Sequence, residues 1–278
     1  MCDLLALARR QFGAGVSATG LAALSPSPAN AATVAWRDAT IKTPDGVCDA
    51  WFVAPTTGKH PGVLVWPDVM GLRPAFQQMG RRLAESGFAV LVVNQFYRSI
   101  KAPFVKPGEE WSQPEVRARI LPWRDVLTPV GTVSDAEALV AWLDQQKQVD
   151  GKRGIASTGY CIGGPMVMRT AAARHDRVRA GASFHGAGLA TDKPDSPHLL
   201  VPLMKVEFLF AIADSDDQQN PQEKGLVRAA FAAAKLPAEI EVYQDTMHGW
   251  CPPDSRVHNH AQAEQAWTRQ LALFQRAL

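Results

Sequence analysis

The sequence contains few cysteines, and no two of them have the spacing of a metal or redox site. The four cysteines are Cys2, Cys48, Cys161 and Cys251, and none belongs to a C-x-x-C motif. This spacing argues against a zinc knuckle and against a thioredoxin-like site. If Cys2 is removed with an N-terminal signal, three cysteines remain. At least one thiol then stays free unless it bonds to another chain.

The chain has no long block of basic residues and no long block of acidic residues. The 29 basic and 27 acidic residues are spread along 278 positions, with a formal net charge of +2. Without a basic block or an acidic tail, we expect neither nucleic acid nor a membrane surface as a partner. No two histidines have H-x-x-x-H spacing, so we also expect no metal, and nothing indicates another cofactor.

Long hydrophobic runs are also missing, and the N-terminus has the parts of an export signal instead. Arg9-Arg10 precedes an uncharged, weakly apolar stretch from Gly13 to Leu24, and Ala29-Asn30-Ala31 follows as an A-x-A cleavage site. The stretch is too short and too rich in glycine and serine for a membrane helix. We interpret residues 1–31 as a twin-arginine signal and expect a periplasmic or otherwise exported enzyme. The alternative is a cytoplasmic enzyme with a disordered N-terminus.

Residues 32–278 alternate between strand and helix patterns and are predicted to form one α/β domain. Short continuous apolar runs are typical of strands buried on both faces, so we expect a mainly parallel sheet with helices on both sides. The predicted strands are Val34–Ile41, Cys48–Ala54, Gly62–Trp66, Phe88–Val93, Gly154–Tyr160, Ala180–His185, Phe208–Ala213 and Glu239–Tyr243. The predicted helices are Ala75–Ser86, Ser134–Gln146 with an acidic first turn, Gly164–Arg174, Pro221–Lys235 and Ala261–Ala277. Residues 101–130, rich in proline and tryptophan, form a long excursion that either closes over the site as a lid or packs on it.

The run Gly159-Tyr160-Cys161-Ile162-Gly163-Gly164 joins a predicted strand to a predicted helix. A strand that ends in G-x-nucleophile-x-G and turns at once into a helix is the nucleophile-elbow pattern. The helix N-terminus favours a thiolate at Cys161. The motif alone also fits a buried cysteine beside a glycine-rich turn.

The order of acidic and basic residues downstream strengthens the enzymatic interpretation. Asp214-Ser215-Asp216-Asp217 follows one predicted strand and His248 follows the next, the acid-then-base order of elbow hydrolases. His248 is suited to accept the thiol proton, and one aspartate to orient its ring. His185, also after a strand, either lines the pocket or only satisfies a backbone group.

Four motifs give the chain its resemblance to the dienelactone hydrolase family of the α/β-hydrolase fold. They are Trp66-Pro67-Asp68-Val69-Met70-Gly71-Leu72, Phe96-Tyr97-Arg98, the elbow around Cys161, and Met247-His248-Gly249-Trp250. The resemblance implies a triad of Cys161, His248 and Asp216, with Asp217 as the alternative acid. It implies an oxyanion hole from the backbone N–H groups of Ile162 and Val69. It also places Asp68 where the family has a glutamate that interacts with the thiol.

The resemblance is weaker for substrate binding. Arg98 matches one of the family's two carboxylate-binding arginines, whereas Pro252 occupies the position of the other, and Arg256 lies nearby but off register. We therefore predict a monomeric hydrolase that cleaves an ester, lactone or thioester of a small molecule through an acyl-Cys161 intermediate. The alternatives are an α/β-hydrolase-fold protein that only binds a ligand or partner, and a redox-sensing thiol protein.

Overall fold

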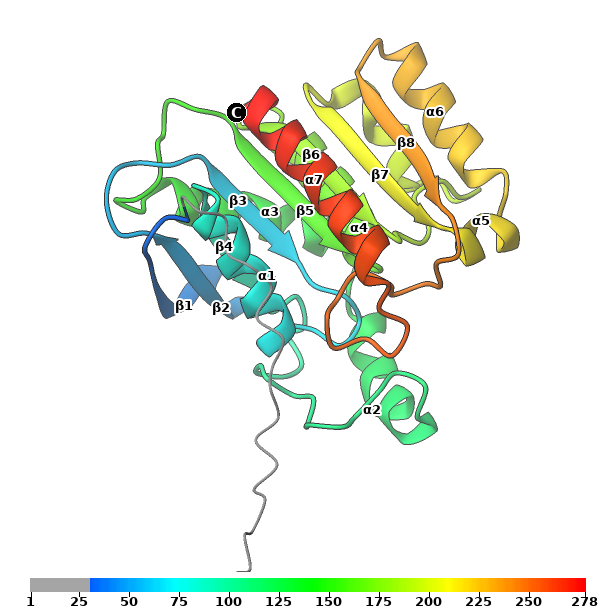
Figure 1. Ribbon diagram of the computed structural model, residues 1–278, viewed down its shortest axis with the longest axis horizontal. Helices are drawn as coiled ribbons and strands as arrows, with labels where there is room; N and C mark the ends of the chain where they lie inside the picture. The colour runs from blue at the N-terminus through cyan, green and yellow to red at the C-terminus, as the bar shows by residue number, and fades with distance from the viewer. Residues whose placement is uncertain (1–30) are drawn as a thin grey trace, which may run out of the picture. The chain divides into compact units, whose positions relative to one another are not determined.

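An eight-stranded sheet forms the centre of the computed structural model, which describes residues 31–278 (Figure 1). The strand order is β1-β2-β4-β3-β5-β6-β7-β8. The strands are β1 (Val34–Thr43), β2 (Gly46–Pro55), β3 (Gly62–Trp66), β4 (Ala89–Val93), β5 (Ile155–Tyr160), β6 (Val178–Phe184), β7 (Glu207–Ala213) and β8 (Ala238–Tyr243). β2 pairs antiparallel with both β1 and β4, and every other pairing is parallel. The predicted, mainly parallel sheet is confirmed.

The predicted signal falls almost entirely on residues 1–30, which lie outside the described part of the chain. Within residues 31–278, no helix is both long enough and apolar enough to cross a bilayer.

Helices cover both faces of the sheet, as predicted. α1 (Pro74–Glu85) and α7 (His260–Ala277) lie in front of it in Figure 1. The opposite face carries α3 (Pro129–Asp144), α4 (Gly163–Ala173), the 3₁₀ helix η1 (Pro197–Leu203) and α6 (Glu223–Ala233). The structure therefore has three layers, with the sheet in the middle.

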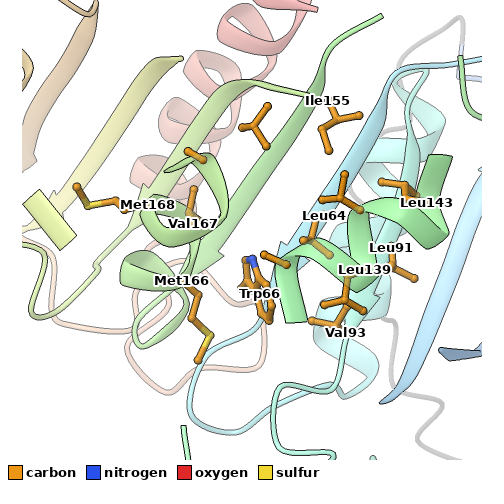
Figure 2. Packing of buried hydrophobic residues seen from close by; sticks show 14 of the residues in the cluster. Leu64, Trp66, Leu91, Val93, Leu139, Leu143, Ile155, Met166, Val167 and Met168 are labelled. Atoms are coloured by element: carbon orange, nitrogen blue, oxygen red, sulfur yellow. The ribbon is translucent and has the colours of Figure 1, made fainter. Parts of the chain in front are cut away.

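The strand sequences explain why both faces are covered. In β3, Leu64 and Trp66 belong to the core under α3 and α4, whereas Val63 and Val65 belong to the core under α1 and α7. Successive side chains of a strand point to opposite faces, so a continuous apolar run needs two apolar layers. Figure 2 shows Leu64 and Trp66 packed with residues of the α3/α4 side, including Leu139 and Val167.

One predicted helix start was wrong, and one segment predicted as a loop is helical. The helix predicted from Ser134 begins at Pro129, where the Thr128 side chain accepts a hydrogen bond from the Gly131 N–H at 3.0 Å. Its supposed acidic first turn therefore lies in the helix interior. The acidic run after β7, predicted as a loop, forms the short helix α5 (Asp214–Gln219). Acidic residues in a first turn are favoured by the positive end of the helix dipole.

The excursion between β4 and α3 contains α2 (Pro114–Asp125) and lies at the end of the sheet where β3 and β5 terminate (Figure 1). α2 contributes Val116 and Ile120 to a small hydrophobic cluster with Val69, Met70 and Phe96. This cluster anchors the excursion beside the loop that follows β3.

Candidate active site

Cys161 lies on the sharp turn between β5 and α4. Its backbone φ is 54°, a left-handed conformation that is strained for any residue except glycine. Two hydrogen bonds hold the turn: the Cys161 N–H donates to the Phe184 carbonyl, and the Gly164 N–H donates to the Cys161 carbonyl, both at 3.0 Å. The geometry is that of a nucleophile elbow.

The two flanking glycines are required by close backbone approaches. A Cβ atom on Gly159 would overlap the Gly163 carbonyl, and one on Gly163 would overlap the Trp66 carbonyl at the end of β3. The pattern G-x-C-x-G is thus required by the tight packing of α4 against β5 and β3, as the sequence predicted.

His248 is hydrogen-bonded to Asp216 and lines the same cavity as Cys161. Its Nδ1 atom lies 3.0 and 2.9 Å from the two carboxylate oxygens of Asp216, which leaves Nε2 as the nitrogen available to Cys161. Burial alone lowers the pKa of His248, but the neighbouring Asp216 and Cys161 side chains raise it to about 10. The ring therefore retains its second proton readily.

Asp216 and Asp217, the two candidate acids, have different partners. Asp217 forms an ion pair with Lys224 at 2.5 Å, whereas Asp216 faces His248. The Ser215 hydroxyl accepts a hydrogen bond from the His248 N–H at 2.9 Å and holds the two loops together. Asp216 is thus the aspartate positioned to orient the imidazole.

The two backbone N–H groups expected at the oxyanion hole come from separate loops beside Cys161. Val69 follows β3 and Ile162 follows Cys161, and both line the same cavity as the Cys161 side chain. Neither amide donates to an acceptor among residues 31–278. Both are therefore free to donate to a substrate oxygen.

A cavity of about 1030 Å³ opens beside Cys161 and His248. One wall consists of residues 105–112 from the excursion, including Trp111, and another of residues 253–257. The two walls are linked by an ion pair between Arg256 and Glu110 at 3.7 Å. The excursion thus forms part of the cavity wall; whether it closes as a lid stays a prediction.

Arg98 does not lie at this cavity, which corrects the position expected from sequence. Its guanidinium binds Asp135 of α3 at 2.7 and 2.8 Å, and Asp45 of the β1–β2 turn at 2.6 and 3.1 Å. Asp135 is nearly buried, so the arginine neutralises an internal carboxylate. This pairing leaves no reason to assign Arg98 to substrate binding.

Asp68 lines the cavity, but both its oxygens are occupied. Oδ1 accepts from Arg73 Nη1 at 2.7 Å and from the Met70 N–H at 2.8 Å, and Oδ2 accepts from Arg73 Nη2 at 3.0 Å. The carboxylate is thus paired with Arg73, and its expected contact with the Cys161 thiol stays a prediction. Sequence reasoning missed Arg73, because nothing in its position before a predicted helix marks it as part of the site.

His185 lines the cavity, which favours the first of its two interpretations. Its ring packs edge-on against His248 with centroids 5.1 Å apart, and neither ring nitrogen has a hydrogen-bond partner within residues 31–278. Burial, reinforced by the charge of His248, lowers its pKa well below the ordinary value of 6.5. His185 is therefore a neutral neighbour of His248.

Three features together define the α/β-hydrolase class. They are the sheet with helices on both faces, the elbow after β5, and the Asp and His that follow β7 and β8. The family model described as "Dienelactone hydrolase family" matches residues 48–278. The chain therefore belongs to the dienelactone hydrolase family and is a hydrolase of the carboxylic ester class.

Individual relatives agree with this assignment, and a solved structure matches the fold. A probable 2-oxo-3-(5-oxofuran-2-ylidene)propanoate lactonase of Bradyrhizobium is 24% identical over 77% of this chain and 83% of its own length. A carboxymethylenebutenolidase of Pseudomonas strain P51 is 26% identical over 80% and 87%. The crystal structure of a putative dienelactone hydrolase from Klebsiella pneumoniae matches the fold with a TM-score of 0.74, at 20% identity, over 87% of this chain and 99% of that one.

Proposed function

We propose that this chain hydrolyses a small-molecule ester or lactone, or the related thioester, through a covalent acyl-Cys161 intermediate. The observation that carries the proposal is the position of His248, which is hydrogen-bonded to Asp216 through Nδ1 and lines the same cavity as Cys161. A nucleophile, a base and a group that orients the base form a unit that activates a thiol.

In the first half-reaction the Cys161 sulfur attacks the carbonyl carbon after its proton has passed to His248. A C–S bond forms, and the negative charge on the carbonyl oxygen is stabilised by the Ile162 and Val69 N–H groups. Each such donor contributes about 3 kcal/mol to the transition state in well-studied hydrolases. The bond to the leaving group, C–O in an ester or lactone and C–S in a thioester, then breaks, and His248 returns the proton to the leaving oxygen or sulfur. In a lactone that oxygen stays on the same molecule, so the ring opens.

In the second half-reaction water takes the place of the leaving group. His248 removes a proton from the water, and the hydroxide attacks the thioester carbon. The C–S bond breaks to release the carboxylic acid, and His248 returns the proton to the Cys161 sulfur. Asp216 stabilises the imidazolium in both steps. No step requires a group that this chain does not supply.

The discriminating experiment is to trap the acyl group. Wild-type protein is mixed with p-nitrophenyl acetate, quenched in acid and analysed by peptide mass spectrometry, and we expect an acetyl group on Cys161. Cys161→Ala should lose both the adduct and turnover. Cys48→Ala is the matched control, because Cys48 is a buried thiol in β2 at a distance from the cavity.

Full turnover by Cys161→Ala would refute the nucleophile assignment. A chain that only binds a ligand would give neither adduct nor turnover in the wild type. A redox-sensing thiol would be modified by peroxide and would form no acyl adduct.

A further inference from the structure

Arg73 is buried at the N-cap of α1 and uses every hydrogen-bond donor of its guanidinium. Nε donates to Asp254 at 2.7 Å. Nη1 donates to Asp68 at 2.7 Å and to the Gly71 carbonyl at 3.2 Å, and Nη2 donates to Asp68 at 3.0 Å and Asp254 at 2.9 Å. These five bonds exhaust the five N–H groups of an arginine. Arg73 has no donor left for a substrate.

The two carboxylates belong to the two loops on which the proposed mechanism depends. Asp68 immediately precedes Val69, whose N–H is one of the proposed oxyanion donors. The backbone carbonyl of Asp68 accepts a hydrogen bond from Gln95 Nε2 at 2.7 Å. Asp254 lies in the loop that carries His248 out of β8 and leads into α7. The planar fork of Arg73, bidentate to both carboxylates, fixes their relative distance and angle.

We infer that Arg73 is a positioning residue that holds the Val69 N–H in register with His248, an inference that rests on the proposed function. A buried ion-pair network contributes little net stability compared with an apolar replacement, but it restricts the arrangement of the groups that it joins. Displacing a catalytic group by about 1 Å costs on the order of 100-fold in rate. The clamp of Asp68, Arg73 and Asp254 therefore acts on the rate of the chemical step.

The chain contains a second cluster of the same design, which supplies the control. Arg98 is bound by the nearly buried Asp135 and the half-exposed Asp45, as Arg73 is bound by the nearly buried Asp68 and the half-exposed Asp254. Asp45 and Asp254 each accept two hydrogen bonds from their arginine. Their side chains are 49% and 46% exposed, so the two alanine substitutions remove nearly equivalent interactions.

The test compares Asp254→Ala with Asp45→Ala by steady-state kinetics on p-nitrophenyl acetate and by thermal unfolding. We expect similar losses of Tm, a kcat at least about tenfold lower in Asp254→Ala with KM within twofold, and unchanged kinetics in Asp45→Ala. Equal kinetics in the two variants would overturn the inference. A rise in KM alone would also overturn it, because Asp254 would then act by contacting the substrate.

A second substitution separates geometry from charge. Arg73→Lys keeps the positive charge but cannot reproduce the two bidentate contacts, so we expect its kcat to fall as far as that of Arg73→Gln. Recovery of wild-type kcat by the lysine would refute positioning by the fork. Acylation of Cys161 in the wild type keeps the two proposals distinguishable. If the wild-type protein forms no acyl-Cys161, the proposed function is refuted. A normal kcat in Asp254→Ala and in the Arg73 variants refutes only the role of Arg73.

Discussion

The Nδ1 atom of His248 lies within 3.0 Å of both carboxylate oxygens of Asp216. A carboxylate on that nitrogen fixes the tautomer of the ring, so the other nitrogen is the one presented to Cys161. The neighbouring Asp217 instead pairs with Lys224, which lies in the first turn of α6. Two adjacent acids thus have separate partners, and only one contacts the histidine.

We predict that Asp216→Asn lowers kcat by about 100-fold or more, because the amide favours the wrong tautomer of His248. The matched control is Asp217→Asn, which breaks the ion pair with Lys224 but leaves His248 oriented. We expect its kcat to stay within a few-fold of wild type. Steady-state hydrolysis of p-nitrophenyl acetate measures the kcat of both variants. The reverse ranking would assign the acid to Asp217.

The pKa of His248 predicts how stability depends on pH. The folded protein holds this proton with a pKa of about 10, raised from 6.5, so it binds the proton more tightly than the unfolded chain does. The resulting stabilisation is fully present below about pH 6.5 and is lost as the pH rises toward about 10. We therefore expect the difference in free energy of unfolding between wild type and His248→Gln to shrink across this range.

Urea denaturation at intervals of pH measures that difference for the two proteins. The control is His175→Gln, which removes a histidine outside the cavity whose Nδ1 hydrogen-bonds with the Ala172 carbonyl at 3.3 Å. The same measurement on this variant gives the effect of losing a histidine that does not face Asp216. A wild-type advantage over His248→Gln that grows with pH would contradict the assigned direction of the pKa shift.

The fold was predictable where local sequence determines structure. The run Gly62–Trp66 is apolar at every position and forms a strand with the same bounds. Local pattern failed at α3, because its first turn, Pro129-Val130-Gly131-Thr132, has no amphipathic spacing and is identified only by its cap at Thr128. It failed again at α5, where an acidic run typical of a loop forms a single short helix.

The site was predictable where chain order determines it. An elbow cysteine, then an acid, then a histidine, each after a strand, meet at one end of a parallel sheet. The partners of arginines could not be predicted in the same way. Arg98 binds Asp135 across 37 positions, and Arg73 binds Asp254 across 181. Pairing at such separations depends on tertiary packing, which no local pattern records.

The corrected position of Arg98 predicts a loss of stability rather than of substrate binding. Arg98→Gln leaves Asp135 buried without its cation, and burial already raises the pKa of that carboxyl. We expect a loss of about 3 kcal/mol in the free energy of unfolding, with KM within twofold of wild type. Arg276→Gln breaks an exposed pair with Glu207 and should cost less than about 1 kcal/mol. A several-fold higher KM without destabilisation would restore the substrate-binding interpretation.

Replacing glycine by alanine should have opposite effects on stability at Gly159 in the elbow and at Gly225 in α6. A Cβ on Gly159 would overlap the backbone carbonyl of Gly163, and neither backbone can move without shifting β5 or α4. We expect Gly159→Ala to cost about 2 kcal/mol or more in the free energy of unfolding. Gly225, exposed within α6, has no atom within 4 Å of the new Cβ, so Gly225→Ala should stabilise by about 0.5 to 1 kcal/mol. Thermal unfolding monitored by circular dichroism measures both, and destabilisation by the two variants alike would show that close packing at the elbow is not the cause.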